Sequence, residues 1–203
     1  MQPELIKKTK CILYRTSIFS AYGMTEIAPI SIKKYDNENE CENLSEVGEL
    51  IKEMKVKFIP QNDIQETGFT IGEVCINHSM IEKERYSDDG WFHTGDIGYL
   101  DERGELLLCG RLKNMLIRNG INIFPEVIEK KIRKSELIKE IVVFLDDSKL
   151  VSNIVVENPD EFELAHLIKY CKENLETEEM PCNFKIVEFI EKNESMKIIR
   201  NRQ

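Results

Sequence analysis

An aspartate and an arginine stand at the two ends of a pattern that predicts a β-hairpin. Asp96 comes before the pattern and Arg111 comes after it, and apolar runs flank a polar turn at residues 101–104. A carboxylate accepts hydrogen bonds from hydroxyl groups and a guanidinium donates them, so this pair could hold a polyol such as ribose. On spacing alone, a surface hairpin with an incidental ion pair is the better explanation.

A second group of polar residues follows a predicted strand near the start of the chain. Residues 22–26 read Tyr-Gly-Met-Thr-Glu, and this sequence predicts a tight turn that presents the hydroxyl of Thr25 and the carboxylate of Glu26. An ordinary turn with exposed polar residues explains the same pattern equally well.

The elements that must position these residues are mostly strands. Residues 33–47 are polar and acidic and predict a solvated loop without chemistry of its own. Alternation of apolar and charged residues is typical of a half-buried strand. The strands predicted before the hairpin cover residues 11–14, 17–20, 48–51, 54–59 and 72–76.

The last 90 or so residues predict a compact lobe of helices and strands. Proline at position 125 suits the first turn of a helix, and apolar residues at helical spacing continue from it. The other predicted elements are paired strands at 141–145 and 150–156, an amphipathic helix at 160–175 and a strand at 185–190. The fold class expected for the whole chain is therefore α+β.

Composition excludes several classes of function. The chain has 203 residues, a net charge of −9 and a pI near 5.1, which argues against binding to nucleic acid or to an anionic membrane. No apolar run is long enough to span a membrane, and no signal peptide is evident. The six cysteines lack a Cys-x-x-Cys pair and the three histidines are scattered, so we expect reduced thiols, no metal site among them and a cytoplasmic protein.

A two-part signature and three further stretches together resemble a known family. Residues 89–96, Asp-Gly-Trp-Phe-His-Thr-Gly-Asp, and residues 110–114, Gly-Arg-Leu-Lys-Asn, are similar to the signature of AMP-forming acyl-CoA synthetases, in the adenylate-forming superfamily. Three further stretches occur in family order, at residues 22–26, 120–125 and 195–200. The resemblance covers nearly the whole chain, which is what makes it specific.

The resemblance implies roles for the polar residues introduced above, all of them in binding ATP with Mg²⁺. A hard cation prefers carboxylate oxygen beside substrate phosphates, so the chemistry suits the implied roles. These roles are ribose binding by Asp96 and Arg111, contact with the α-phosphate by Thr25, Mg²⁺ binding by Glu26, and lining of the nucleotide pocket by Tyr22 and Gly23.

Two further roles are implied nearer the C-terminus. Lys197 falls where the family has its catalytic lysine, although Met196 replaces the usual glycine. If the neighbouring residues did not match the family motif, Lys197 would be read as one more lysine in a charged tail. Gly120 falls where the backbone approaches the pantetheine thiol of CoA, and a glycine needed only for a turn is an equally good reading.

The resemblance also implies two domains. Residues 1–112 would be the C-terminal part of the large AMP-binding domain, including a distorted β-barrel subdomain, and residues 113–203 would be the small mobile C-terminal domain. Asn114 stands at the hinge position, where relatives commonly have Asp or Lys. His93 stands where many relatives have Arg or Lys, and we assign it no role.

The implied reaction joins a carboxylic acid to a thiol in two steps. The carboxylate attacks the α-phosphate of ATP and releases pyrophosphate, and CoA, or a phosphopantetheinyl carrier protein, then displaces AMP. The family's upstream phosphate loop has no counterpart in these 203 residues, so we expect that the chain lacks an N-terminal half and does not adenylate a substrate alone. A non-catalytic remnant is the third reading.

Overall fold

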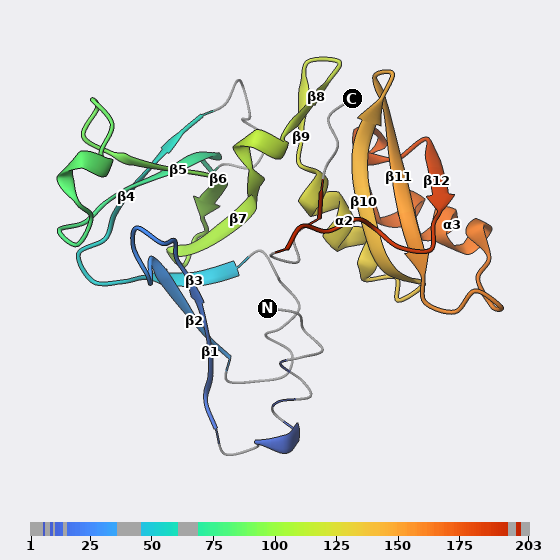
Figure 1. The fold of residues 1–203 in the computed structure, drawn as a ribbon, viewed down its shortest axis with the longest axis horizontal. Helices are drawn as coiled ribbons and strands as arrows, with labels where there is room; N and C mark the ends of the chain where they lie inside the picture. Colours follow the sequence, from blue (N-terminus) through green and yellow to red (C-terminus); the bar gives the residue numbers. More distant parts are fainter. Residues whose placement is uncertain are drawn as a thin grey trace. The chain divides into compact units, whose positions relative to one another are not determined.

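The computed structural model describes residues 6, 9, 11–13, 16–35, 46–60, 69–194 and 198–199. The chain divides into two compact units, Met1–Leu112 and Lys113–Gln203. The described residues form one large antiparallel sheet, a smaller sheet, a two-stranded hairpin and two α-helices (Figure 1). The α+β class expected from the sequence is therefore confirmed.

The first unit is organised around a seven-stranded antiparallel sheet in the order β1-β2-β3-β7-β6-β5-β4. The outer strands of this sheet are β1 and β4. The strands are β1 (Ile18–Tyr22), β2 (Ser31–Tyr35), β3 (Glu46–Leu50), β4 (Lys55–Ile59), β5 (Gly72–Asn77), β6 (Phe92–Leu100) and β7 (Glu105–Arg111), and the 3₁₀ turn η2 (Lys83–Arg85) lies between β5 and β6.

The hairpin predicted around residues 101–104 is formed by β6 and β7. Asp101 accepts hydrogen bonds from the backbone N–H groups of Arg103 and Glu105, each 2.9 Å from its Oδ1, and this closes the turn. The core beside the hairpin is apolar because β5, β6 and β7 each turn apolar residues inward. Its buried members include Val74, Ile76, Phe92 and Leu106.

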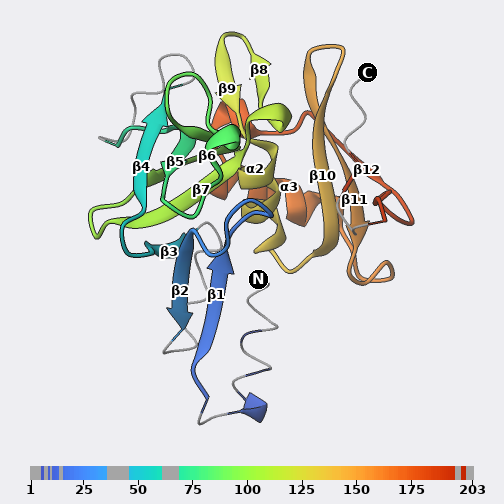
Figure 2. The same ribbon diagram turned by 60° about the vertical axis from the view of Figure 1, so that its left-hand side comes forward.

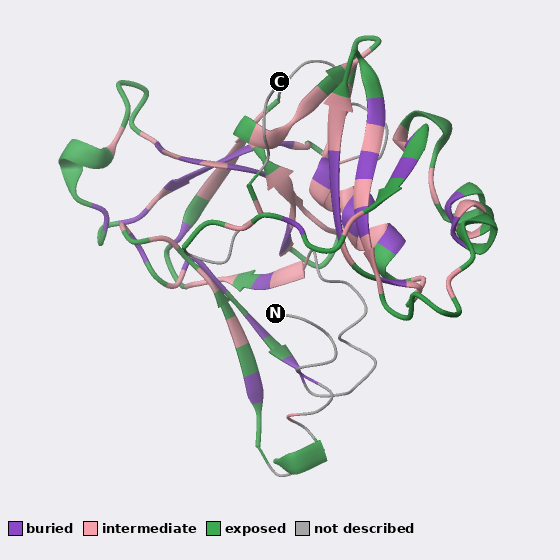
Figure 3. Cartoon of the chain, turned by 45° about the vertical axis from the view of Figure 1, so that its right-hand side comes forward, coloured by how far each residue is buried: buried purple, intermediate pink, exposed green. Residues whose placement is uncertain are grey.

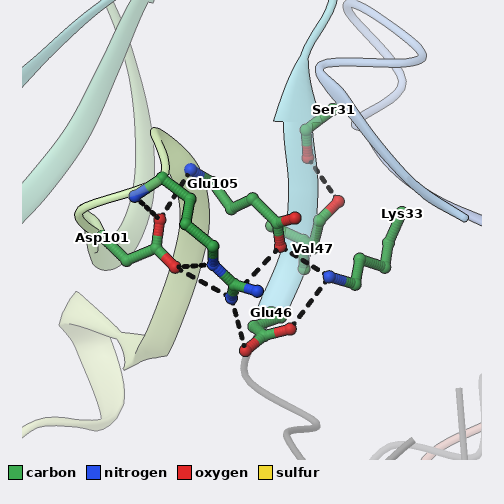
Figure 4. Close-up of polar contacts among 7 residues, drawn as sticks. Ser31, Lys33, Glu46, Val47, Asp101 and Glu105 are labelled. Carbon is green, nitrogen blue, oxygen red and sulfur yellow. Dashed lines mark hydrogen bonds and ion pairs between the residues drawn. The ribbon is translucent and has the colours of Figure 1, made fainter. Parts of the chain in front are cut away.

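The loop predicted for residues 33–47 is wrong where the structure describes it. Residues 33–35 belong to β2, in which buried and exposed residues alternate (Figure 3). The polar sequence misleads because Lys33 is buried: its Nζ lies 2.6 Å from Glu105 Oε2 and 3.0 Å from Glu46 Oε2 (Figure 4). A buried ammonium needs such partners, and here two carboxylates supply them.

The strand predicted for residues 11–14 is also wrong in its described part. Cys11 and Ile12 have helical backbone, and the N–H of Leu13 donates to the carbonyl oxygen of Thr9 at 2.8 Å, which is a helical i to i−4 bond. Four apolar or aromatic residues in a row do not distinguish a short strand from a helical turn.

The second unit packs two helices against a three-stranded sheet in the order β10-β11-β12 (Figure 2). The sheet pairs β10 with β11 in antiparallel and β11 with β12 in parallel orientation. The elements are η3 (Leu112–Asn114), which begins in the first unit, β8 (Leu116–Arg118), β9 (Ile121–Ile123), α2 (Pro125–Arg133), β10 (Ile138–Asp146), β11 (Lys149–Val156), α3 (Leu164–Asn174), η4 (Thr177–Glu179) and β12 (Asn183–Ile186).

One core holds the second unit together. It joins α2, through Ile128 and Ile132, to α3, through Leu167, and to the strand residues Ile141 and Ile154. Among the described helices, none has the length and apolar content needed to cross a membrane.

Candidate functional site

Three strands bring Tyr22, Asp96 and Arg111 together. Asp96 on β6 lies directly opposite Arg111 on β7, and Arg111 Nε is 2.9 Å from Asp96 Oδ1. The hydroxyl of Tyr22, the last residue of β1, donates to Asp96 Oδ2 at 2.6 Å. The structure thus joins Tyr22, from the predicted motif at residues 22–26, to Asp96 of the predicted ribose-binding pair.

The Asp96 carboxylate is more buried than the Arg111 guanidinium that pairs with it. The side chain of Asp96 is 6% exposed and that of Arg111 is 44% exposed. Burial, together with the charge of Asp96, raises the pKa of the Tyr22 phenol far above its usual value, so the phenol stays a proton donor. A carboxylate offers about four acceptor positions, so Asp96 can accept further hydroxyl groups beside Tyr22 and Arg111.

Hydrogen bonds to β5 fix the backbone at Asp96. The N–H of Asp96 donates to Thr94 Oγ1 at 3.1 Å, and the Thr94 hydroxyl donates to the carbonyl oxygen of Val74 at 2.7 Å. The N–H of Gly95 donates to Glu73 Oε1 at 3.2 Å. These contacts hold β6 where its pairing with β5 is irregular, and they set the position of the Asp96 carboxylate.

The motif at residues 22–26 forms a turn that folds back onto β1. The N–H of Ile30 donates to the carbonyl oxygen of Tyr22 at 2.6 Å. A Cβ atom on Gly23 would lie 2.9 Å from Ala28 Cα, so only glycine fits without a shift of the backbone. Thr25 is exposed, and Glu26 is partly buried with its Oε1 4.0 Å from Arg85 Nη1.

That turn suits a hard cation. The ion pair of Glu26 is long, and its side chain is 25% exposed, so a carboxylate oxygen can be offered to an ion together with phosphate oxygens of a substrate. The Mg²⁺ role expected for Glu26 and the phosphate role expected for Thr25 are compatible with this geometry and remain predictions.

Gly120 lies at the tip of the β8–β9 hairpin in the second unit. The two residues of this turn, Asn119 and Gly120, have φ angles of 52° and 80°. Positive φ at both positions is typical of a type I′ turn, which requires small or turn-forming residues such as Asn-Gly. The turn alone therefore explains the glycine, and its role near CoA remains a prediction. Lys197 lies outside the described residues.

Residue spacing did not single out His93, which the structure places among polar side chains. His93 Nδ1 lies 3.0 Å from Glu73 Oε2 and 3.6 Å from Cys75 Sγ. The pairing of β5 with β6 sets Cys75 opposite His93, and such cross-strand pairing cannot be read from residue spacing. The only sequence signal was the Glu-x-Cys pattern within a predicted strand.

Comparison with known proteins identifies relatives of the chain, although no family model matches it. A 2-succinylbenzoate–CoA ligase of Listeria monocytogenes is 34% identical over 190 residues, which cover 91% of this chain and 40% of the ligase. A long-chain-fatty-acid–CoA ligase of Mycobacterium tuberculosis is 33% identical over 142 residues, which cover 64% of this chain and 28% of that ligase.

Solved structures agree in fold. O-succinylbenzoate coenzyme A synthetase of Bacillus subtilis, in complex with AMP, superposes with a TM-score of 0.78 at 25% identity and covers 100% of this chain and 43% of its own. The chain matches less than half of the length of these curated relatives, 40% of the Listeria ligase and 28% of the Mycobacterium ligase. The chain belongs to the AMP-forming acyl-CoA synthetases of the adenylate-forming superfamily and corresponds to a C-terminal portion of its members.

Proposed function

We propose that this chain is the C-terminal part of an ATP-dependent acid–thiol ligase. The whole enzyme adenylates a carboxylic acid, with release of pyrophosphate, and then transfers the acyl group to the thiol of CoA. CoA is favoured over a carrier protein because the two ligases described above, each more than 30% identical to this chain, are named as CoA ligases.

One observation carries the proposal: the Asp96 carboxylate is held by Tyr22 and Arg111 with acceptor capacity left for ligand hydroxyls. A ribose offers two adjacent hydroxyls, which match an acceptor next to an exposed guanidinium. Because β5 fixes the backbone at Asp96, the carboxylate needs little rearrangement to bind a nucleotide.

The remaining proposed site residues stabilise or shield negative charge during the reaction. Attack of a carboxylate on a phosphate brings two anions together, so fixed positive charge is needed where negative charge develops. Lys197 bridges the carboxylate and the α-phosphate, and Thr25 contacts that phosphate. Glu26 holds Mg²⁺, which when bound shields the charge of the phosphates.

The two units have different tasks. Residues 1–112 supply the nucleotide-site turn and the ribose-binding pair, and residues 113–203 form the small C-terminal domain that carries Gly120 and Lys197. Adenylation also requires a phosphate loop and an acyl pocket, which these 203 residues do not supply. The chain by itself therefore has no substrate-dependent exchange between ATP and pyrophosphate.

Calorimetric titration of the 203-residue chain with AMP tests the proposal. We expect saturable binding that is lost in Arg111→Ala and in Asp96→Asn. The matched control is Arg103→Ala, because Arg103 also pairs with an aspartate, Asp101, at the opposite end of the same hairpin. This control should bind AMP like the unchanged chain.

Two outcomes would contradict the proposal. One is AMP binding that survives in Arg111→Ala and Asp96→Asn. The other is the absence of AMP binding to a chain whose circular dichroism and cooperative unfolding show that it is folded.

A further inference from the structure

Three side chains that prefer metals meet on β5 and β6 of the first unit. They are the carboxylate of Glu73, the thiol of Cys75 and the imidazole of His93, and their ligand atoms all lie within 4.8 Å of one another. Glu73 and Cys75 are 8% and 0% exposed, whereas the side chain of His93 is 32% exposed. The cluster is therefore buried on one side and reachable from solvent on the other.

The spacing of the ligand atoms fits a tetrahedral ion. His93 Nδ1 is 3.6 Å from Cys75 Sγ and 3.0 Å from Glu73 Oε2. Tetrahedral zinc, with bonds of about 2.0–2.3 Å, places neighbouring ligand atoms about 3.3–3.7 Å apart. An ion between the three atoms thus requires an outward movement of the Glu73 carboxylate, because 3.0 Å is shorter than this spacing.

The other nitrogen of the imidazole is already oriented. His93 Nε2 lies 3.4 Å from Asp89 Oδ2, and Asp89 is in turn held by Lys57 Nζ at 2.7 Å. Metal-binding histidines commonly direct their second N–H to a carboxylate, which fixes the ring and the tautomer. Asp89 would do this here and leave Nδ1 facing Glu73 and Cys75.

We propose that Glu73, Cys75 and His93 form a binding site for one Zn²⁺ ion, with water as the fourth ligand. Thiolate and imidazole ligands favour zinc over magnesium, so this site is chemically distinct from the Mg²⁺ role proposed for Glu26. The half-exposed imidazole leaves the water position open to solvent. The ion would tie β5 to β6 three residues before Asp96 and stabilise the sheet there.

Metal binding at this cluster is coupled to proton release. The hydrogen bond to Glu73 raises the pKa of the His93 imidazole. Zn²⁺ binding would release to solvent the proton of the Cys75 thiol and any proton on His93 Nδ1, because thiolate and neutral imidazole are the ligating forms. Burial, with the charge of Glu73, raises the pKa of the free Cys75 thiol to about 12, so the ion must displace that proton.

Titration of the full chain with Co²⁺, a spectroscopic substitute for zinc, tests the site. Tetrahedral Co²⁺ with a thiolate ligand gives intense visible bands and a sulfur-to-metal charge-transfer band. We expect both bands to saturate at one ion per chain and to disappear when Zn²⁺ is added. No thiolate band in the folded chain would overturn the proposal.

Variants assign the bands to residues. Cys75→Ala should abolish the charge-transfer band, and His93→Gln, which keeps a polar side chain on the exposed side, should weaken binding at least tenfold. Cys182→Ser and His166→Gln are the matched controls because both residues are exposed, and they should bind Co²⁺ normally. A band that persists in Cys75→Ala, or that is lost in Cys182→Ser, would contradict the site.

A second readout compares the thermal unfolding of the unchanged chain with that of one folded variant. Zn²⁺ should raise the unfolding temperature of the unchanged chain, because an ion that binds only the folded state stabilises it. The same ion should leave the unfolding temperature of folded Cys75→Ala unchanged. An equal rise in both proteins would mean that Zn²⁺ binds elsewhere.

Discussion

Tyr22 and Asp96 are 74 residues apart in the sequence, and their side chains are joined by a 2.6 Å hydrogen bond. The bond connects an outer strand of the seven-stranded sheet to its central hairpin. The turn that follows Tyr22 is thereby anchored to the carboxylate proposed to bind ribose, so the two predicted motifs act as one site.

Tyr22→Phe should weaken both the fold and nucleotide binding. The variant keeps the ring and removes the donor to Asp96, and a hydrogen bond to a charged group stabilises a protein by roughly 1.5–3 kcal/mol. We expect AMP affinity, measured by calorimetry, to fall on the order of tenfold because the carboxylate loses one of its two anchors.

The control for that variant is Tyr86→Phe in the same unit. The hydroxyl of Tyr86 donates to the carbonyl oxygen of His78 at 2.7 Å and accepts from the N–H of His78 at 3.1 Å, so this variant loses two hydrogen bonds. Its stability should fall by about 1–3 kcal/mol while AMP affinity stays unchanged. Equal losses of AMP affinity in both variants would exclude a specific role for Tyr22.

Lys33→Met should destabilise the first unit by about 2–3 kcal/mol. The side chains of Glu46 and Glu105 are 14% and 16% exposed, and the variant removes the ammonium that lies between them. Urea unfolding measures the effect. Lys55→Met, at an exposed position of β4, is the control and should change stability by less than about 0.5 kcal/mol.

Charge rather than packing should account for the Lys33 result. The double variant Lys33→Met/Glu105→Gln removes one of the carboxylates left without the ammonium, so it should be more stable than Lys33→Met alone. If the double variant is less stable than the single one, the loss comes from packing.

Asp101 should make the stability of the first unit depend on pH in the acid range. Desolvation pushes the pKa of Asp101 up, but hydrogen bonds from the Glu105 N–H and from Arg103 outweigh it, so the pKa lies below its usual 3.8. A carboxyl group with a lowered pKa in the folded state contributes stability above the unfolded value, and this contribution is lost as the pH falls through the folded value.

Asp101→Asn isolates that contribution, because the amide oxygen can still accept the two backbone N–H bonds of the turn. The difference in unfolding free energy between the unchanged chain and the variant should be constant near neutral pH and shrink below about pH 4. Glu102→Gln, at an exposed position of the same turn, is the control. A difference that grows toward acid pH would show that the pKa shift has the opposite sign.

Lys197→Ala should stop adenylation without preventing AMP binding. The residue is proposed to stabilise negative charge only in the transition state, so its loss should lower the rate by roughly 10²–10³-fold. The measurement is substrate-dependent exchange between ATP and pyrophosphate in the complete enzyme. Lys192→Ala is the control because Lys192 pairs with Glu140 at 2.6 Å. Undiminished exchange in Lys197→Ala would refute the catalytic role.

Local patterns in the sequence were sufficient for most of the described strands and for the helices α2 and α3. The β6–β7 hairpin, the helix opening at Pro125 and the β10–β11 pair all follow from apolar periodicity and turn residues, which act over a few neighbours. Lys33 was predicted in a loop because its burial depends on Glu105, 72 residues away, and no local pattern reports such a partner.

The candidate site was likewise predictable only where its residues lie within one local pattern. Asp96 and Arg111 could be proposed as a pair because one hairpin contains both. The bond from Tyr22, and the cluster of Glu73, Cys75 and His93, depend on which strands become neighbours and in which register. The resemblance to a family supplied roles for single residues, whereas the geometry supplied the contacts among them.

The order of strands in the large sheet has a consequence for handling the chain. Of its two outer strands, β4 carries Lys55 and Lys57, whereas β1 has no charged residue and exposes 54% of Phe19. Charged side chains on an edge strand discourage pairing with another chain, and β1 lacks them. Self-association of the purified chain should therefore begin at β1, and Phe19→Lys should raise the concentration at which the chain stays monomeric.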